Sequence, residues 1–443
     1  MSQNSQTMLA VLLVVGLVVG AGVGYFMAPQ GGGEIEYVDV PGDTIEVHPL
    51  AGKTIKWGVT ASNTIGLETT QPLVEDIIEP DLNDYVDLLG LDITIDLLVE
   101  DNQGTASIAL EKTQTYKAMG INIVQGHGWS SQCGSALSYV NENDMIMISA
   151  SSTSPLYAIP DDMLFRTCPT DFVQGPAIAT MFKTWGIEAV LTMHRADAWG
   201  DGIWNVLEPL WEPNGIEDLG RIRYAGEVTE FSSYLDQANT IITEAIETYG
   251  IDKVGMQFFS FDEERTIQSQ AADYPNLMGI IWMSTESRGR DQLMVNEVGD
   301  LAVPTRHFSS LMGSDEASFK FMSLDERFME ETERRASFYT GTSYDSNWMI
   351  LKAVLETGQI GATPIADVFI DLSYEYHGTT GWVSLDENGD RQAQMFDIWG
   401  YYFNADGDPD FRKWGRYDGQ AIDVTWDDAA ITAAGMSRPA LGG

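Results

Sequence analysis

The sequence contains few of the residues that bind metal ions. Only two of its 443 residues are cysteines, Cys133 and Cys168, which allows one disulfide and excludes a zinc site with four thiolate ligands. The five histidines are scattered along the chain without the spacing of metal ligands. No Gly-x-Gly-x-x-Gly segment follows a strand-like run, and there is no Walker lysine motif. We therefore expect neither a structural metal nor a nucleotide cofactor.

Basic residues are also scarce. The chain has 24 Lys and Arg against 66 Asp and Glu, a formal net charge of −42. A surface this acidic repels phosphate backbones, which argues against binding to nucleic acids. The acidic excess runs along the whole chain and is typical of a solvated surface, as in proteins from saline habitats; attraction of a cationic substrate is the alternative.

One long hydrophobic run is present, close to the N-terminus. Residues 8–27 carry no charge, and a helix of twenty residues at about 1.5 Å per residue spans the roughly 30 Å hydrocarbon layer of a bilayer. We expect a short head at 1–7, a retained transmembrane anchor at 8–27 and a tether rich in Gly, Pro and acidic residues at 28–52. Cleavage near residues 21–24, with secretion of the rest, is the alternative.

The orientation of this anchor does not follow from flanking charge, because no Lys or Arg precedes Lys53. A head of seven uncharged residues and a large acidic domain favour a cell-membrane location with the globular domain outside.

From residue 53 onward, short apolar runs alternate with longer amphipathic ones, and no repeats interrupt them. This alternation predicts an α/β fold with parallel sheets, in two blocks that meet near residues 168–170. Predicted strands lie at 55–59, 93–99, 121–125, 145–149, 189–193, 253–259 and 278–283. Predicted helices lie at 73–89, 105–118, 136–141, 173–185, 202–212, 232–249, 263–272 and 337–356. Ligands of such sheets bind at the carboxyl ends of the strands.

The segment GHGWSSQCGSA, residues 126–136, lies where a strand passes into a helix. Gly128 to Gln132 resembles the Gly-x-Ser-x-Gly turn of hydrolases, but Gln132 replaces the second glycine that the sharp turn requires. A catalytic triad would also need a late histidine, for which His307 and His377 are available. A serine hydrolase is therefore the weaker interpretation.

The same segment suits a binding site for a small charged group. Unpaired N–H groups at a helix N-terminus stabilise an anion, and Ser130 and Ser131 add hydroxyl donors beside them. The next predicted strand ends in Ser151, Ser152 and Thr153. Hydroxyls from two neighbouring strand ends would converge on a carboxylate or a similar polar group; serine-rich capping without a ligand is the alternative.

A second polar segment, FNADGDPDF, places oxygen-bearing side chains at alternate positions from Asn404 to Asp410. Calcium could use this spacing, but the glycine and bidentate glutamate of an EF-hand loop are missing. A polar turn is the favoured interpretation, and calcium binding is left open.

Several motifs, taken in order, resemble the solute-binding proteins of branched-chain amino-acid, amide and urea ABC transporters, in a membrane-anchored form. They are VEDNQGTASIALEKTQTYKAMGINIVQGH, SSQCGSALSYVNENDMIMISASSTSP, FRTCPTDFVQGPAIA, YDSNWMILKAVLETG and GTTGWVSLDENGD followed by FDIWGY. The resemblance covers residues 53–402 and implies the type I periplasmic-binding fold, in which two Rossmann-like lobes joined by three crossovers close around a solute. It implies lobe 1 at 53–168 and 308–378 and lobe 2 at 169–307 and 379–419. A C-terminal tail at 420–443 follows, and we expect the last twenty residues of the chain to be loosely ordered.

The resemblance also implies a ligand site. Ser130 at the helix start and the strand-end positions Ser151 and Thr153 correspond to the family's ligand-binding positions, with Ser131 beside them. The aromatic positions of lobe 2 fall on Trp199 and Phe259, and the acid that pairs with a ligand's ammonium falls on Glu286, with Asp262 and Glu263 as rivals. Each aromatic could instead be part of the core.

The cysteines lie at the lobe 1 edge of this implied cleft. We expect a disulfide between Cys133 and Cys168, which in the chain-entropy model stabilises the fold by roughly 3–4 kcal/mol for a loop of about 35 residues. Two buried free thiols are the alternative.

The function implied is that of a non-enzymatic receptor that captures a small polar or zwitterionic solute, foremost an amino acid, and delivers it to an ABC permease in the membrane. Amide or urea binding and a sensor ectodomain are alternatives on the same fold. A hydrolase and a cation-gathering surface protein are alternatives from other classes.

Overall fold

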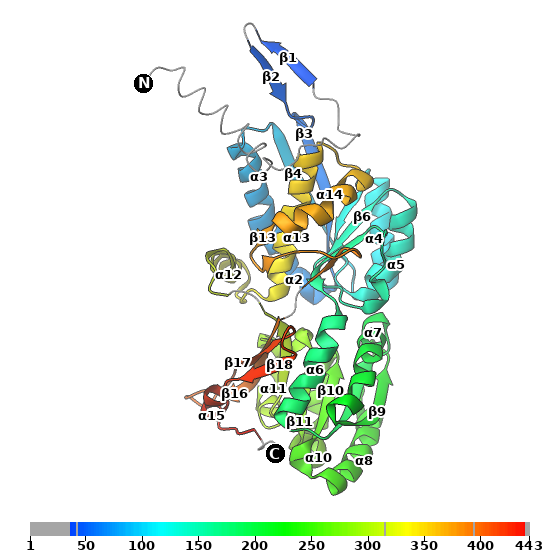
Figure 1. Ribbon diagram of the computed structural model, residues 1–443, viewed down its shortest axis with the longest axis vertical. Helices are drawn as coiled ribbons and strands as arrows, with labels where there is room; N and C mark the ends of the chain where they lie inside the picture. The colour runs from blue at the N-terminus through cyan, green and yellow to red at the C-terminus, as the bar shows by residue number, and fades with distance from the viewer. Residues whose placement is uncertain (1–35, 41–42, 314–315, 393–394, 439–443) are drawn as a thin grey trace.

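The computed structural model describes residues 36–40, 43–313, 316–392 and 395–438. Two lobes lie one above the other along the long axis, and a hairpin projects from the upper lobe (Figure 1). In this hairpin β1 (Glu36–Val40) pairs antiparallel with β2 (Asp43–Val47). The hairpin lies within the segment 28–52, which was predicted as a tether rich in Gly, Pro and acidic residues.

None of the helices in the described ranges combines the length and apolar character needed to cross a bilayer. The anchor predicted at 8–27, with its head at 1–7, lies outside the described residues.

The upper lobe, lobe 1, is built on a six-stranded sheet of order β15-β7-β6-β5-β3-β4. All of its paired strands run parallel. The strands are β3 (Lys53–Ala61), β4 (Ile93–Asp101), β5 (Ile123–Gln125), β6 (Ile146–Ser149), β7 (Leu164–Pro169) and β15 (Asp390–Arg391).

Helices cover both faces of this sheet because alternate strand residues point to opposite sides. Ile123 packs with one core and its neighbour Val124 with the other. The first core lies against the π-helical turn η1 (Leu73–Ile78), α3 (Glu79–Leu88), α12 (Phe319–Thr332), α13 (Phe338–Thr357) and α14 (Ala362–Glu375), with α2 (Thr64–Pro72) preceding η1. The second core lies against α4 (Ala106–Ala118) and α5 (Ser130–Glu142).

The lower lobe, lobe 2, has an eight-stranded sheet of order β18-β17-β16-β12-β11-β10-β8-β9. Its strands from β9 to β12 run parallel, and β16, β17 and β18 join them antiparallel. They are β8 (Ala189–Arg195), β9 (Glu217–Tyr224), β10 (Val254–Phe259), β11 (Ile281–Ser284), β12 (Phe308–Met312), β16 (Met395–Phe403), β17 (Pro409–Asp418) and β18 (Asp423–Trp426).

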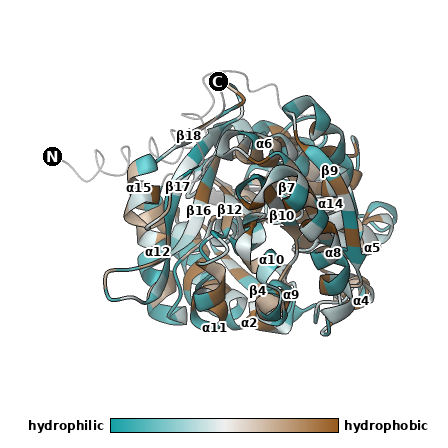
Figure 2. Ribbon diagram, turned by 90° about the horizontal axis from the view of Figure 1, so that it is seen from below, coloured by the Kyte–Doolittle hydropathy of each residue, from teal (hydrophilic) through white to brown (hydrophobic). Residues whose placement is uncertain are grey.

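Helices surround these strands when the molecule is viewed along its long axis, and single helices carry both hydrophobic and hydrophilic residues (Figure 2). One core includes residues of α6 (Asp171–Trp185), α7 (Ala198–Leu207) and α15 (Asp428–Ala433). The other includes residues of α8 (Ser232–Tyr249), α9 (Glu263–Gln270) and α10 (Pro275–Gly279). A smaller cluster packs α11 (Gln292–Ala302) against Tyr401 of β16.

Two of the implied lobe boundaries are wrong. Residues 308–312, assigned to lobe 1, form β12 of the lobe 2 sheet. Residues 390–391, assigned to lobe 2, form β15, which pairs with β7 in lobe 1. The sequence around each crossover shows no shift in composition, so the boundary follows from pairing with strands far away in the chain.

The expectation that the last twenty residues are loosely ordered is also wrong for the described part of them. β18 extends the lobe 2 sheet, and α15 follows with Ala430 and Ile431 buried. The ring of Trp426 contacts that of Trp185 edge-on at 5.0 Å, so a distant aromatic core orders this segment.

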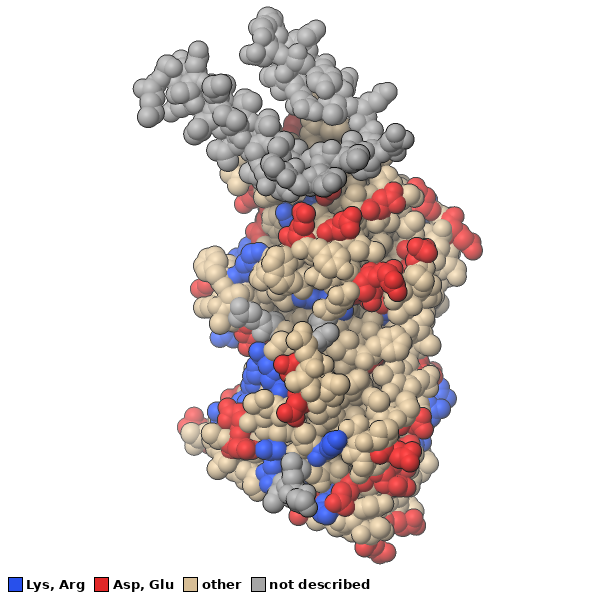
Figure 3. All heavy atoms as spheres, viewed as in Figure 1, with Lys and Arg blue, Asp and Glu red and all other residues tan. Residues whose placement is uncertain are grey.

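The carboxyl ends of the parallel strands in the two lobes face each other across the boundary between them, which is where the fold places a ligand. On the visible face of the molecule, acidic side chains are spread over both lobes (Figure 3).

Candidate ligand-binding site

The serine segment forms the start of α5, six residues earlier than predicted. Trp129 is the N-cap, with extended backbone angles of −89° and 142°. The Gln132 side chain accepts the Trp129 N–H at 3.4 Å and donates to the Ser62 carbonyl at 2.7 Å. Gln132, which counts against a hydrolase turn, therefore fixes the helix start against the neighbouring strand β3.

Ser130 joins the two strand ends that were predicted to converge. Its Oγ accepts hydrogen bonds from Ser152 Oγ at 3.0 Å and from the Ser154 N–H at 3.1 Å, and the residue is 2% exposed. The Ser130 hydroxyl donates to no acceptor among the described residues. This O–H group can therefore donate a hydrogen bond to a ligand. Ser131 is half-buried on the next position of the helix.

Ser151 and Thr153 leave the same strand end in different directions. Ser151 Oγ donates to the Gly128 carbonyl at 3.0 Å within lobe 1. Thr153 Oγ1 donates to Asp171 Oδ2 at 3.0 Å, and the Asp171 N–H donates to the Thr153 carbonyl at 2.9 Å. Thr153 thus meets the first residue of α6, and its hydroxyl contacts a carboxylate of lobe 2.

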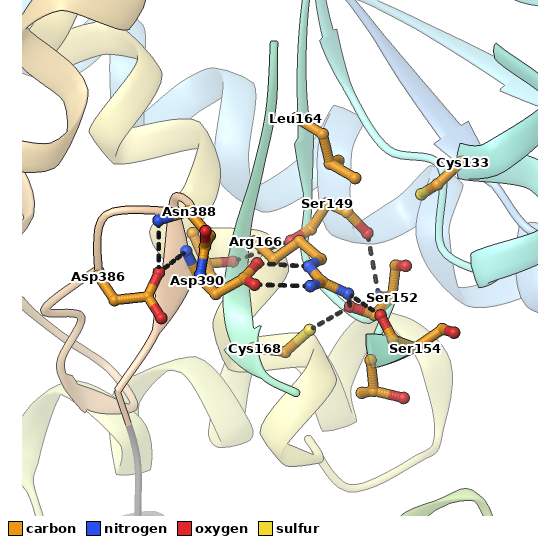
Figure 4. A network of polar contacts seen from close by, with 12 residues as sticks. Cys133, Ser149, Ser152, Ser154, Leu164, Arg166, Cys168, Asp386, Asn388 and Asp390 are labelled. Atoms are coloured by element: carbon orange, nitrogen blue, oxygen red, sulfur yellow. Dashed lines mark hydrogen bonds and ion pairs between the residues drawn. The ribbon is translucent and has the colours of Figure 1, made fainter. Parts of the chain in front are cut away.

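A buried arginine that was not predicted as functional holds this loop in place. Arg166 of β7 donates to the Ser154 carbonyl at 2.7 Å and the Ser152 carbonyl at 3.3 Å. It also forms a two-pronged ion pair with Asp390, at 2.5 and 2.7 Å (Figure 4). Through Arg166, the loop after β6 is connected to Asp390 of β15, which lies more than two hundred residues later in the chain. Strand β15 therefore supports the loop that carries Thr153.

Lobe 2 contributes two buried carboxyl groups, Asp171 and Glu286. Glu286 begins the short helix η7 (Glu286–Arg288) and accepts Gln174 Nε2 at 2.5 Å. Burial raises the pKa of Asp171 well above its usual range, and the charge of Glu286 raises it further. Burial also raises the pKa of Glu286. Because each carboxyl is held away from water beside another acid, this pair favours a positively charged neighbour.

The aromatic positions differ from the predicted ones. Trp199, near the start of α7, is 3% exposed and stacks on Phe261 with ring centroids 4.5 Å apart. Phe261 also stacks on Trp129 of lobe 1, at 4.6 Å. Phe259 is fully buried in the lobe 2 core, which favours the alternative that this ring is part of the core. Phe261 lies two residues beyond it, in the loop after β10, and is the aromatic that reaches the other lobe.

The rival acids Asp262 and Glu263 are engaged in ion pairs. Asp262 accepts from Arg265 at 2.9 Å and from Asn63 of lobe 1 at 3.3 Å. Glu263 accepts from Arg195 at 2.8 Å. Both carboxylates are neutralised by arginines, so Glu286 is the better candidate for a ligand's cation.

The lobes therefore touch across the cleft. The contacts include Thr153 with Asp171, Trp129 with Phe261, Asn63 with Asp262, and Ser154, whose Oγ donates to the Ala198 carbonyl at 2.7 Å. A cavity of about 620 Å³, lined by Arg306, Phe403 and Met436 among others, lies at the opposite end of the lobe 2 strands. It contains none of the predicted site residues.

The predicted disulfide is wrong. Cys133 and Cys168 are both buried free thiols. Cys133 packs in the lobe 1 core under α5 and donates to the His127 carbonyl at 3.0 Å, whereas Cys168 packs with the lobe 2 core and donates to the Ser152 carbonyl at 3.4 Å. The two cysteines lie in the same region of the fold, but each thiol packs into a different core. The sulfurs therefore do not form a bond.

The histidines proposed for a hydrolase do not reach Ser130. His307 is buried in lobe 2, where its Nε2 lies 3.0 Å from Glu264 and 2.8 Å from Ser284 Oγ. His377 contacts Trp382 edge-on in β13–β14. Ser130 accepts two hydrogen bonds but meets no general base among the described residues.

The acidic segment at 404–410 forms the turn between β16 and β17 and the first two residues of β17. Asn404 Oδ1 accepts the N–H groups of Asp406 and Asp408, each at 3.0 Å, and Asp410 Oδ1 accepts the Phe411 N–H at 2.8 Å. These oxygens cap the turn, as the polar-turn interpretation predicts.

Comparisons with known proteins agree with this architecture. Residues 80–403 match the family model described as the receptor family ligand binding region. An uncharacterised protein of Methanocaldococcus jannaschii is 26% identical over 395 residues, covering 84% of this chain and 91% of that protein. A leucine-, isoleucine-, valine-, threonine- and alanine-binding protein of Pseudomonas aeruginosa is 22% identical over 301 residues, covering 65% and 73%.

A solved structure shows the same fold. The leucine-binding protein of Thermotoga maritima superimposes with a TM-score of 0.65 at 15% identity, covering 85% of this chain and 99% of that one. The family model describes a ligand-binding region, and the Pseudomonas aeruginosa and Thermotoga maritima proteins are named as binding proteins and not as enzymes. The family model matches most of the chain, and the protein has the type I periplasmic-binding fold. This protein therefore belongs to the family described as "receptor family ligand binding region".

Proposed function

We propose that this protein is the extracytoplasmic solute-binding component of an ABC importer, and that it captures a small zwitterionic solute, foremost an amino acid, between its lobes. The Pseudomonas aeruginosa relative is named for the amino acids that it binds, and the Thermotoga maritima structure is of a leucine-binding protein. Both support an amino acid as the first ligand class to test.

One observation carries this proposal: opposite chemistries face each other across the lobe boundary. Lobe 1 presents the Ser130 hydroxyl at the start of α5 and the Thr153 hydroxyl, which donates to Asp171, after β6; lobe 2 presents the buried acids Asp171 and Glu286. A carboxylate suits hydroxyl and N–H donors, and an ammonium suits the acids. A zwitterion can satisfy both halves at once.

Closure follows from this division of the site. A ligand that contacts both lobes binds the closed conformation more tightly than the open one, and it shifts the equilibrium only by that difference in affinity. The stack of Trp129 on Phe261 is a further contact between the lobes, and separation of the lobes would break it. Binding energy is thereby converted into a shape that a permease can distinguish.

A thermal-shift screen of the purified full chain tests the proposal. The panel comprises amino acids, amides, urea and short peptides, and binding to the native state raises the melting temperature. Stabilisation by amino acids supports the proposal, stabilisation by amides or urea alone favours the alternative ligand classes, and no stabilisation by any of them contradicts a solute-binding role.

The variant Thr153→Ala is expected to weaken ligand binding by about 1–3 kcal/mol, because it leaves the buried Asp171 oxygen without its donor. Isothermal titration calorimetry measures this loss. Thr305→Ala is the matched control, since Thr305 is also buried and its hydroxyl also donates a hydrogen bond, in this case to the Ala302 carbonyl. Thr305 lies at the other end of the lobe 2 sheet, away from the candidate site. Equal affinity of Thr153→Ala and wild type would remove Thr153 from the site.

We further propose that residues 8–27 anchor the chain in the cell membrane with both lobes outside, beside the permease. The uncharged, apolar composition of this segment supports the anchor. The protein is expected to stay with the membrane fraction after alkaline extraction. In a separate experiment, protease added to intact cells is expected to digest the two lobes. Release of a shortened chain into the medium would support cleavage instead.

A further inference from the structure

We infer that Glu264 is a positioning residue for the candidate site: its buried carboxylate fixes the two lobe 2 loops that carry Phe261 and Glu286. The inference rests on the proposed function and adds a residue behind the cleft that acts on the affinity of the site without touching the ligand. The two loops are residues 260–262, between β10 and α9, and residues 285–288, which follow β11.

Glu264 lies on α9 with no access to solvent. The side chains of Glu264 and of its partner His307 are both 0% exposed. Removing a carboxyl group from water is costly unless hydrogen bonds and opposite charge compensate for the lost hydration. The groups that supply this compensation are therefore the ones that Glu264 joins together.

The hydrogen-bond donors come from three neighbouring strands, β10, β11 and β12. Ser260, directly after β10, donates to Glu264 Oε2, and Ser284, the last residue of β11, donates to Oε1. His307, directly before β12, has its Nε2 3.0 Å from Glu264 Oε1 and 2.8 Å from Ser284 Oγ. Because an ionised carboxylate can only accept, this Nε2 carries the proton. One side chain thus ties the three strands together.

The same contacts reach the two cleft loops. The Glu264 N–H donates to the Phe261 carbonyl at 3.1 Å, so this residue holds the first loop with its backbone as well as its side chain. The Ser287 hydroxyl donates to the Ser260 carbonyl at 2.7 Å, which joins the second loop to the first. Glu286 directly precedes Ser287 in the chain. A displacement of Ser260 would therefore move both Phe261 and Glu286.

The charge of Glu264 strengthens these contacts. Burial opposes ionisation, but the hydrogen bond and charge of His307, together with the two serine hydroxyls, outweigh burial and lower the pKa of Glu264 below its usual range. Its negative charge also acts on Arg288, which ends the second loop, and on the phenols of Tyr401 and Tyr224. Glu264 is therefore ionised at neutral pH, and hydrogen bonds to an ionised acceptor are stronger than those between neutral groups.

The variant Glu264→Gln keeps the length of the side chain and removes its charge. L-leucine, L-threonine and L-alanine are the probes, and calorimetry measures their affinity. We expect binding to be about 5- to 50-fold weaker than in wild type, because the amide has one acceptor oxygen for three donors. The variant Glu264→Asp retains the charge and should bind more tightly than Glu264→Gln, which a loss of volume or packing alone would not predict.

Hydrogen exchange followed by mass spectrometry reads the position of the loops directly. In Glu264→Gln, peptides that cover 260–262 and 285–288 should exchange faster than in wild type, while α8 should keep its protection. Faster exchange everywhere, or unchanged exchange in both loops, would overturn the inference. This measurement uses the full chain without ligand, so it tests the inference even if wild type binds none of the probes, a result that would count against the proposed function.

Glu79→Gln is the matched control. Glu79 Oε2 accepts the Leu97 N–H at 2.7 Å between α3 and β4 of lobe 1, away from the cleft. This variant should leave affinity and loop exchange unchanged. If Glu264→Gln does not fold, Ser260→Ala, which removes one donor and little volume, replaces it with the same expected directions. Wild-type affinity in Glu264→Gln, or an equal loss in Glu79→Gln, would contradict a positioning role for Glu264.

Discussion

The Arg166–Asp390 ion pair offers the sharpest test of how the site is held together. The arginine side chain is 0% exposed and that of Asp390 is 4% exposed. Burial raises the pKa of Asp390 even with the guanidinium beside it, so the cost of desolvation is large here. Removing one partner of a buried pair strands the other charge and costs about 3–5 kcal/mol. We therefore expect Arg166→Met to destabilise the protein by that amount.

The double variant Arg166→Met/Asp390→Leu separates charge from hydrogen bonding. It removes both charges, so most of the electrostatic cost should be recovered. The carbonyls of Ser152 and Ser154 remain without their donor, which leaves a loss of about 1–3 kcal/mol. Arg334→Met, which breaks an exposed pair with Glu68, is the control and should cost less than about 1 kcal/mol.

Urea unfolding followed by tryptophan fluorescence measures these free energies. Arg166→Met should also weaken ligand binding, because the loop that carries Thr153 loses its support. A loss below about 1 kcal/mol for Arg166→Met, or a double variant less stable than the single one, would refute the reasoning.

Two further predictions concern the cleft and the lobe 1 interior. Trp129→Ala should weaken ligand binding by about 1–3 kcal/mol, since the ring stacks on Phe261 and its centroid lies 5.4 Å from the Arg195 guanidinium. Calorimetry measures the affinity. Small-angle scattering should show a more open molecule. Burial lowers the pKa of His127 to about 3 from the ordinary 6.5, so this residue contributes stability that is complete above pH 6.5 and is lost as the pH falls towards 3. Between pH 7 and pH 5 the loss is about 2 kcal/mol, and urea unfolding should show a shallower pH dependence for His127→Gln.

Each of these variants has a matched control. Trp382→Ala removes a ring that is 58% exposed on β14 and should leave both affinity and scattering unchanged. His48→Gln removes a half-buried histidine and is the control for the loss of a histidine as such. An unaltered affinity in Trp129→Ala would remove the interlobe stack from the account. An identical pH slope in wild type and His127→Gln would contradict the buried neutral histidine.

Local sequence patterns predicted much of the fold. Helix α8 begins and ends at the predicted residues because its apolar face recurs at helical spacing and Gly250 ends it with positive φ. Strand β7 was not predicted because Arg166 interrupts its apolar run. The burial of this charge depends on Asp390, which lies far along the chain. The partner of a buried charge is set by tertiary structure, which periodicity does not encode.

Local patterns also predicted that the polar residues around Ser130 and after β6 come together. Ser130 and Thr153 could be found because both follow apolar runs, and strand ends of a parallel sheet converge. Phe259 and Phe261 are both aromatic and two residues apart, so the sequence could not show that the strand buries the first and the loop presents the second. Asp171 gave no signal beyond a helix start, because its significance depends on the distant Glu286.

A crystal structure of the protein with the amino acid that stabilises it most would test the central claim directly. The account predicts one ligand between the lobes, with its carboxylate at the Ser130 hydroxyl and its ammonium at Glu286. A ligand bound instead in the cavity beside Arg306, or on the surface of one lobe alone, would contradict it.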